Sequence, residues 1–290
     1  MILLADSGST KTHWALMAAN GDVTECITDG INPFFQTSEA MKNTISNQLL
    51  PKIGSLLWVG PVTDVFFYGA GCTPEKKPFV HDAVAAVFRK AEVHVESDMA
   101  GAAKALFGHG RGIACILGTG SASCVWDGTQ FAQTVPSLGF ILGDEGSGAV
   151  LGRRLVSDLL KNQLPEDLKE AFLQDYHTSM ADIIENVYRK PFPNRYLANL
   201  ARFAAEHIDH PLIHSLVYDH FTQFVVRNLK QYPQDLPVGF VGGVAFHYQE
   251  VLREVLADQH LTLVRILPDP IPGLTEYHRQ DARPTTPAEE

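Results

Sequence analysis

The sequence predicts an α/β protein built from two similar halves, in which each half is a mixed sheet flanked by helices. Three observations predict this class. One order of elements, three strands followed by alternating helices and strands, occurs twice along the 290 residues. A turn rich in glycine and hydroxyl side chains joins the first two strands of each half. The chain is also 45% hydrophobic and 19% charged, a composition that supports large cores and excludes a disordered chain.

The first half, residues 1–108, is expected to form one domain that opens with three strands. Asn20-Gly21 separates the second strand from the third and is a strong hairpin signal. Short runs bounded by turn residues predict strands over residues 2–6, 12–17, 23–27, 63–68 and 93–96. Amphipathic spacing predicts helices over residues 38–50, 78–89 and 99–107, with Ser38 as a candidate cap of the first helix.

The second half, residues 109–290, is expected to repeat this order with a helical insertion. Asp127-Gly128 is again a hairpin signal. The predicted strands are residues 113–117, 122–126, 130–135, 238–241 and 261–267. The predicted helices are residues 147–160, a proline-interrupted series up to residue 232, residues 245–258 and a short helix around residues 273–278. The last segment can pack back on the first domain, and residues 283–290 look like a solvated tail.

Composition excludes several classes of function. The net charge is −10, and no basic stripe of a nucleic-acid-binding protein is present. No run of eighteen apolar residues predicts a membrane span, and no basic stretch precedes the apolar N-terminal residues as in a signal peptide. The four cysteines form no CxxC pair, which predicts free thiols and a cytoplasmic location.

Each half carries a turn of glycine and hydroxyl residues that is suited to binding phosphate. Glycine exposes backbone N–H groups because no Cβ atom blocks the approach, and hydroxyls add donors. Neither turn is a Walker A loop, and neither opens a helix as the dinucleotide-binding fingerprint does. Lys11 can add positive charge, although it can equally be a solvated strand lysine. The residues expected at the phosphates are Gly8, Ser9, Thr10, Lys11, Thr119, Gly120 and Ser121.

Two aspartates stand next to strand ends, where side chains can reach a shared site. Asp6 can hold Mg²⁺ through water, or it can simply accept hydrogen bonds from nearby backbone amides. Asp98 follows a strand and precedes a helix. Its carboxylate can accept the proton of an attacking hydroxyl, cap the helix, or do both.

Three further segments offer contacts to a polar small molecule. Asn32 lies in a turn, where its amide can bind a substrate. Asp144 and Glu145 stand between glycines, where they can accept hydrogen bonds from sugar hydroxyls or simply favour a helix N-terminus. Gly242 and Gly243 end a strand before a helix, where a flat base can pack on bare backbone or where the chain only needs a tight turn.

The order and spacing of these motifs make the chain resemble the actin-like ATPase superfamily over nearly its whole length. It is similar to the BadF/BadG/BcrA/BcrD-type ATPases and, among these, to the N-acetylglucosamine kinases. The motifs are the first phosphate motif ADSGSTKT (5–12), the second LGTGS (117–121), the adenosine motif GFVGGV (239–244) and the run GDEGS (143–147). Ser7 and Ser9 depart from the pattern, because glycines are common at those positions.

The resemblance implies two domains of ribonuclease-H-like topology, with MgATP and a sugar in an interdomain cleft. It implies ATP-dependent phosphorylation of an amino sugar, with N-acetylglucosamine at its C6 hydroxyl as the leading expectation. Asp98 matches the catalytic base and Asp6 the Mg²⁺-associated aspartate. Asn32 and Asp144 match sugar-binding positions, and Glu145 is adjacent. The matched phosphate contacts are Thr10, Thr119 and Gly120.

Two other functions stay open at this stage. An ATPase activator of a radical dehydratase or reductase holds an iron–sulfur cluster through cysteines, whereas here no cysteine follows Cys124. A non-catalytic sensor would bind sugar and nucleotide without turnover, although the presence of Asp6 and Asp98 argues against it. The expected partners are ATP and an amino sugar, with neither nucleic acid nor membrane, and a homodimer is the default assembly. Glucosamine, N-acetylmannosamine and N-acetylmuramic acid stay open as substrates.

Overall fold

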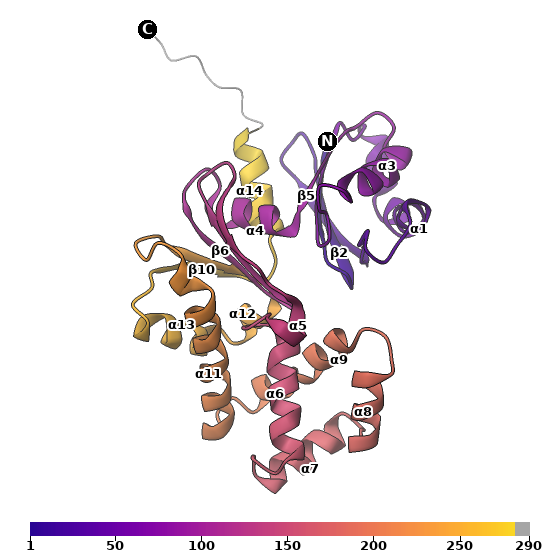
Figure 1. The fold of residues 1–290 in the computed structure, drawn as a ribbon. Coiled ribbons are helices and arrows are strands. Elements are labelled where there is room, and N and C mark those ends of the chain that lie inside the picture. Colours follow the sequence, from indigo (N-terminus) through magenta and orange to yellow (C-terminus); the bar gives the residue numbers. More distant parts are fainter. Residues whose placement is uncertain (282–290) are drawn as a thin grey trace. The chain divides into compact units, whose positions relative to one another are not determined.

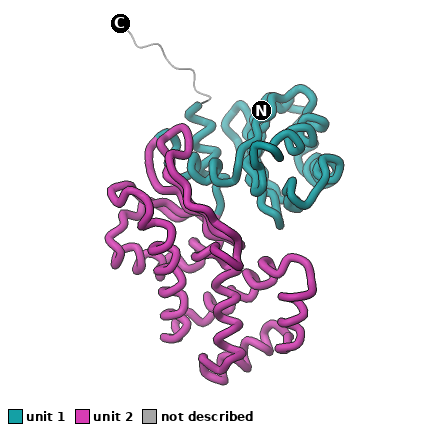
Figure 2. The backbone as a smooth tube through the Cα atoms, in the orientation of Figure 1, with its two compact units in different colours: residues 1–109, 269–290 teal, residues 110–268 magenta. Residues whose placement is uncertain are grey.

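Two compact units make up the chain in a computed structural model that describes residues 1–281 (Figures 1 and 2). Unit 1 consists of Met1–His109 and the chain from Asp269 onward, and unit 2 consists of Gly110–Pro268. Each unit holds one five-stranded mixed sheet with helices around it, so the predicted fold class is confirmed. The predicted tail, residues 283–290, lies outside the described residues. No helix within residues 1–281 is long and apolar enough to cross a membrane.

The sheet of unit 1 has the strand order β3-β2-β1-β4-β5. Its strands are β1 (Ile2–Ser7), β2 (Lys11–Met17), β3 (Val23–Asp29), β4 (Asp64–Gly69) and β5 (Glu92–Ser97). β1 pairs antiparallel with β2 and parallel with β4, so the sheet is mixed. All five strands overlap the predicted ranges, because each is a short apolar run bounded by turn residues.

One face of this sheet is covered by the helices between β3 and β5. They are α1 (Ser38–Thr44), the π-helical turn η1 (Ile45–Leu49), α2 (Leu50–Ile53), the 3₁₀ turn η2 (Leu56–Trp58) and α3 (Lys77–Val87). The prediction of one regular helix over residues 38–50 is therefore wrong, because a π-helical turn separates two short α-helices there. The predicted cap is also wrong, because Thr37 rather than Ser38 caps α1 by accepting a hydrogen bond from the Ala40 backbone N–H.

The other face of the unit 1 sheet is covered by α4 (Asp98–Phe107) and α14 (Ile271–Asp281), which pack side by side (Figure 1). A glycine permits this close packing, because a Cβ atom on Gly273 would lie 2.3 Å from the Ala105 carbonyl oxygen. A 3.0 Å hydrogen bond between the Tyr68 hydroxyl and His278 Nε2 ties α14 to β4. Helix α14 thus packs as part of unit 1, although 159 residues of unit 2 separate it from the rest of that unit in sequence.

The sheet of unit 2 has the strand order β10-β9-β6-β7-β8. Its strands are β6 (Gly112–Leu117), β7 (Ser121–Trp126), β8 (Phe131–Val135), β9 (Val238–Val241) and β10 (Leu263–Leu267). β6 pairs antiparallel with β7 and parallel with β9, which repeats the arrangement of β1, β2 and β4 in unit 1. The predicted repeat of strand order therefore reflects two sheets of the same topology.

Ten helical segments belong to unit 2 among the described residues. They are α5 (Gly139–Leu142), α6 (Gly148–Leu160), α7 (Glu166–Asp175), α8 (Met180–Tyr188), α9 (Pro193–Leu200), α10 (Arg202–Glu206), α11 (Pro211–Arg227), η3 (Leu229–Gln231), α12 (Gly243–His247) and α13 (Gln249–Asp258). The helix predicted over residues 245–258 is divided at Tyr248. Prolines stand at the starts of α9 and α11, where their missing N–H group has no helical partner to lose.

The close contact between α6 and α9 in unit 2 leads to a prediction about stability. A Cβ atom on Gly152 of α6 would lie 1.9 Å from the Leu197 carbonyl oxygen of α9. Gly152→Ala should destabilise the protein by about 2 kcal/mol, because the clash outweighs the gain in helix propensity. Urea unfolding followed by circular dichroism measures this change. Gly60→Ala is the control, because no atom lies within 4 Å of its added Cβ. Equal midpoints for the two variants would contradict the packing argument.

Candidate active site

Three carboxylates gather at one edge of the unit 1 sheet. Leu3 and Ala5 of β1 belong to the core under α1 and α3, so strand alternation places Asp6 on the face covered by α4 and α14. Both helices start at the edge where β1 ends. Asp98 is the first residue of α4, and Asp269 accepts a 3.0 Å hydrogen bond from the Ile271 N–H at the start of α14.

The charges of this cluster shift the pKa values of its members. Burial, and after it the nearby carboxylates of Asp98 and Asp269, raise the pKa of Asp6 to about 7. Burial also raises the pKa of Asp98, against the lowering effect of hydrogen bonds from the backbone N–H groups of Met99 and of Asp98 itself. Both groups therefore hold protons more tightly than exposed aspartates do.

Asp98 does not cap its helix. Ser97 is the N-cap residue, because its hydroxyl oxygen accepts a 3.3 Å hydrogen bond from the Ala100 N–H. One oxygen of the Asp98 carboxylate accepts a 2.9 Å hydrogen bond from the Met99 N–H. The capping interpretation of Asp98 is thus wrong.

His13 of β2 lies between the three carboxylates and the neighbouring strand β3. It lies opposite Asp6 in the β1–β2 ladder. Its Nδ1 atom is 3.4 Å from Asp269 Oδ1, and its Nε2 atom is 2.9 Å from Glu25 Oε2. The hydrogen bond to Asp269 raises the pKa of His13 despite its partial burial. The sequence analysis missed both His13 and Asp269. These two residues contact each other although 255 residues lie between them in the chain.

The first glycine turn is folded tightly against the segment after β3. The Gly8 N–H donates a 3.0 Å hydrogen bond to the Lys11 carbonyl oxygen. A Cβ atom on Gly30 would lie 2.5 Å from the Gly8 carbonyl oxygen, so only glycine fits there. Thr10 and Lys11 are exposed and available to a ligand.

Asn32 is joined directly to this turn. Its Nδ2 group donates a 2.7 Å hydrogen bond to the Ser9 hydroxyl, and its Oδ1 atom accepts a 2.9 Å hydrogen bond from the Phe34 N–H. The Asn32 side chain is buried, and Gly71 leaves the room that it needs. The structure therefore brings together one residue predicted at the phosphates and one predicted at the sugar.

The second glycine turn and the run Gly143–Ser147 form one structure in unit 2. The N–H groups of Gly148 and Ala149 donate hydrogen bonds of 2.8 and 3.2 Å to the carbonyl oxygens of Gly118 and Thr119. Asp144 adopts the left-handed conformation (φ 55°), and its carboxylate lies against Gly120. Burial raises the pKa of Asp144 to about 6, although the backbone N–H groups of Ser121 and Gly139 donate to it.

Two residues of helix α11, His220 and Arg227, lie against the run Gly143–Ser147. Arg227 Nε pairs with Glu145 Oε1 at 2.5 Å. The ring of His220 is buried beside the backbone of Gly146 and Ser147, and its Nε2 atom makes no hydrogen bond within the described residues. Burial lowers the pKa of His220 to about 4, so its ring is neutral at pH 7. Glu145 thus has a protein partner, and His220 and Arg227 are supporting residues that no local motif reveals.

The adenosine motif packs on the second glycine turn. Gly242 has a φ of 122°, and a Cβ atom there would lie 2.4 Å from the Leu117 carbonyl oxygen. Its N–H group donates a 2.9 Å hydrogen bond to the Leu267 carbonyl oxygen. Gly243 starts α12 and is exposed, with no side chain to cover the backbone. Gly242 is therefore required for packing, whereas Gly243 offers an open surface to a ligand.

A separate group of potential metal ligands lies at the opposite end of the unit 1 sheet. Asp64, Glu92 and His94 have ligand atoms within 4.8 Å of one another. Asp64 and Glu92 begin β4 and β5, whereas Asp98 follows the end of β5. Five residue steps along a strand span about 17 Å, so this group is not part of the carboxylate edge.

Comparison with solved structures shows what the chain is similar to. A proposed N-acetylglucosamine kinase from Porphyromonas gingivalis is 49% identical, with a TM-score of 0.93 over 98% of this chain and 100% of that chain. A second proposed N-acetylglucosamine kinase, from Chromobacterium violaceum, is 19% identical, with a TM-score of 0.74 over 95% and 98%. MamK bound to AMPPNP is 14% identical, with a TM-score of 0.50 over 97% and 98%. No protein-family model and no curated protein matches.

The raised pKa of Asp6 predicts a pH dependence of stability. A carboxyl group whose pKa is near 3.8 when unfolded and about 7 when folded destabilises the fold increasingly as the pH rises between these values. Asp6→Asn removes this cost, so it should be more stable than the wild type by on the order of 2 kcal/mol at pH 8 and about equal to it near pH 4. Thermal unfolding at stepped pH measures the gap. Asp209→Asn, at an exposed site, is the control, and a gap independent of pH would contradict the pKa shift.

Proposed function

Because this chain belongs to the family of the proposed N-acetylglucosamine kinase from P. gingivalis, within the actin-like ATPases, we propose that it is an ATP-dependent sugar kinase. The observation that carries the proposal is the proximity of two buried aspartates, Asp6 and Asp98, at one sheet edge, where burial raises the pKa of both. A 49% identity over the full length of both chains supports the same conclusion.

Asp98 is the proposed general base. The C6 hydroxyl oxygen of the sugar would attack the γ-phosphorus of ATP, its proton would pass to the Asp98 carboxylate, and the bond from the γ-phosphorus to the ADP oxygen would break. The raised pKa of Asp98 favours this role, because a carboxylate with a higher pKa is a stronger base at neutral pH. The hydrogen bond from Met99 keeps the carboxylate in one orientation.

Asp6 is the proposed holder of Mg²⁺. The donor chemistry fits, because Mg²⁺ prefers carboxylate oxygens and Asp6 is buried beside the carboxylates of Asp98 and Asp269, with a pKa raised to about 7 by burial first and by these charges second. A divalent cation there would offset this repulsion. When bound, Mg²⁺ supplies charge neutralisation at the phosphates of ATP. MamK, which shares the fold, has been solved with AMPPNP, which is consistent with nucleotide as the phosphoryl donor.

The proposed sugar contacts are Asn32 in unit 1 and Asp144 in unit 2, with Glu145 beside the latter. Asp144 is held by backbone N–H donors and a glycine neighbour, so its position is well defined. We assign the phosphate contacts to Gly8, Ser9, Thr10, Lys11, Thr119, Gly120 and Ser121, and the adenine surface to Gly242 and Gly243. N-Acetylglucosamine is the proposed substrate, in line with the similarity to two proteins named for that reaction.

The cysteines do not favour the alternative of an iron–sulfur activator. All four are free and lie in the described part of the chain, and none belongs to a group of three potential metal ligands there. A purified protein without iron and without a visible absorption band would remove this alternative. The cytoplasmic location and the homodimer stay predictions.

Replacing the proposed base should abolish turnover. Asp98→Asn should lower kcat at least about 100-fold and change the KM for N-acetylglucosamine by no more than a few-fold, because the base acts in the transition state. ³¹P NMR of the sugar phosphate, together with ADP release, measures the reaction. The control is Asp82→Asn, an exposed carboxylate on α3. ADP release that continues without sugar, or survives in Asp98→Asn, would overturn the assignment of the base. Binding of both ligands without product in the wild type would favour a sensor.

The two acids of the unit 2 run should differ in their effect on sugar binding. Asp144→Asn should raise the KM for the sugar by about 10- to 100-fold, the loss of a charged hydrogen bond. Glu145→Gln should raise it less than about fivefold, because the Glu145 carboxylate already pairs with Arg227. The wild-type KM should also rise as the pH falls through about 6, where Asp144 gains a proton, and it should stay flat in Asp144→Asn. The reverse ranking of the two variants would contradict these roles.

A further inference from the structure

The residues Asp64, Glu92 and His94 lie on one face of the unit 1 sheet, at the end opposite the three carboxylates of the candidate active site. Glu92 and His94 are two positions apart on β5, so their side chains leave the same face of that strand. Asp64 is the partner of Glu92 in the parallel β4–β5 ladder, which places the two side chains next to each other. The ligand atoms of all three residues lie within 4.8 Å of one another. Two neighbouring strands therefore hold an imidazole and two carboxylates together.

Two negative charges stand directly opposite each other in this set. Like charges at paired positions of a sheet repel each other and destabilise it unless a cation neutralises them. Within residues 1–281, no lysine or arginine forms an ion pair with Asp64 or Glu92, and the ion-pair partner of Glu92 is His94. The fold therefore brings together two carboxylates whose repulsion a bound cation would offset.

The imidazole is placed as a metal ligand would be. His94 Nε2 lies 3.6 Å from Glu92 Oε1. Two ligands at about 2.1 Å from a tetrahedral ion lie about 3.4 Å from each other, so the observed separation is close to that of two ligands of one ion. The His94 ring stacks on Phe66 of β4, with 4.5 Å between the ring centroids and an angle of 11° between the planes, which fixes the orientation of the ring.

The three side chains are open to solvent, so an ion can reach them. Of the Glu92 side chain 74% is exposed, and of the His94 side chain 37%. Asp64 is partly buried. Three protein ligands leave at least one position of a four-coordinate ion to water, which an exposed site supplies.

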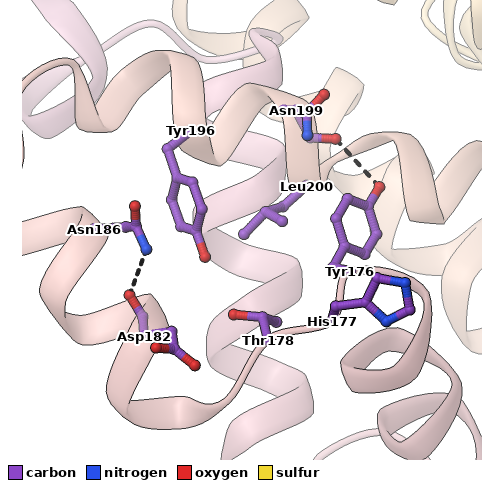
Figure 3. Close-up of a pocket in the computed structure, with 8 residues that line it drawn as sticks. All are labelled: Tyr176, His177, Thr178, Asp182, Asn186, Tyr196, Asn199 and Leu200. Atoms are coloured by element: carbon purple, nitrogen blue, oxygen red, sulfur yellow. Dashed lines mark hydrogen bonds between the residues drawn. The ribbon is translucent and has the colours of Figure 1, made fainter.

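The groove beside α8 and α9 in unit 2 does not offer comparable ligands. Among the described residues that line it, His177 and Asp182 alone carry an imidazole or a carboxylate, and they lie on opposite sides of the groove (Figure 3). The Asp182 carboxylate also accepts hydrogen bonds from the N–H and hydroxyl groups of Ser179. Within residues 1–281, the set on β4 and β5 is the only group of three histidine, cysteine, aspartate or glutamate side chains with ligand atoms this close.

We propose that Asp64, Glu92 and His94 bind one divalent first-row transition-metal ion, with Zn²⁺ as the ion to test first. An imidazole nitrogen favours such an ion over Mg²⁺ and Ca²⁺, which prefer oxygen ligands. The ion neutralises both carboxylates and joins the edge strand β5 to β4. The proposal uses no residue of the proposed kinase reaction and does not depend on it.

Zinc titration of the whole chain tests the site. Metal is first removed with a chelator, and Zn²⁺ is then added while calorimetry measures binding and NMR follows the histidine ring signals. The His94 signal is assigned from its loss in His94→Asn. We expect one Zn²⁺ ion to bind at this site with a Kd of roughly 10 μM and to shift the His94 signal, whereas Mg²⁺ should not shift it. Zn²⁺ should also raise the unfolding midpoint by a few degrees, since it binds only the folded site.

Four variants assign the binding to these residues. His94→Asn should weaken Zn²⁺ binding at least about 100-fold, because it removes a ligand. Glu92→Gln changes an exposed side chain, so it should leave the fold intact, weaken binding at least about 10-fold and reduce the rise of the unfolding midpoint. Glu39→Gln, at an exposed glutamate of unit 1, is the matched control and should bind as the wild type does. Asp6→Asn should do the same, which separates this site from the candidate active site.

Three results would overturn the proposal. The first is a His94 signal that does not shift up to about 1 mM Zn²⁺. The second is an equal Zn²⁺ affinity in the wild type, His94→Asn and Glu92→Gln. The third is an equal shift with Mg²⁺, which would mean attraction to two carboxylates only. Because none of these results is read from turnover, a failure of sugar phosphorylation would leave them unaffected.

Discussion

The gathering of Asp6, Asp98 and Asp269 at one sheet edge is the constraint around which unit 1 is arranged. Like charges that are taken out of water repel one another and lose hydration, so such a cluster tends to push its elements apart. The two helices that carry it are fixed from outside the cluster. On α4, Lys104 pairs with Glu96 of β5 at 2.5 Å, and on α14, His278 bonds to Tyr68 of β4. These contacts hold both helix starts beside Asp6, and the raised pKa of Asp6 reflects first its burial and then the repulsion from Asp98 and Asp269.

Contacts between bare backbone segments position the glycine turns in both units. In unit 1 Gly30 lies against Gly8, and in unit 2 Gly242 lies against Leu117. Each contact is closer than any Cβ atom allows, so each locks the turn to a strand-ending segment without using a side chain. The N–H groups of the turns are then presented on a rigid support. Gly30 and Gly242 are therefore explained by backbone packing, without any contact to a ligand.

Local signals in the sequence were sufficient for the sheets but not for the groups that surround the site. Short apolar runs bounded by turn residues predicted every strand, and the repeat of their order and of the glycine turns predicted two sheets of one topology. Asp269, His220 and Arg227 were missed because each contacts a segment that is distant in sequence. The residues next to each of them carry no motif that indicates this contact. The break of the predicted helix at Ile45 was missed for a similar reason, since packing under the sheet rather than propensity decides it.

The two serines that depart from the family pattern have a common consequence. Ser7 is buried and bonds to Thr12 at 2.6 Å and to the Ile31 carbonyl oxygen at 2.9 Å, so it fastens the turn to the segment that leads to Asn32. Ser9 accepts a hydrogen bond from Asn32 itself. Glycine at either position would remove these hydrogen bonds and would leave the turn more free. In this chain the first glycine turn and Asn32, the proposed sugar contact, are therefore joined by hydrogen bonds, and a displacement of one is expected to displace the other.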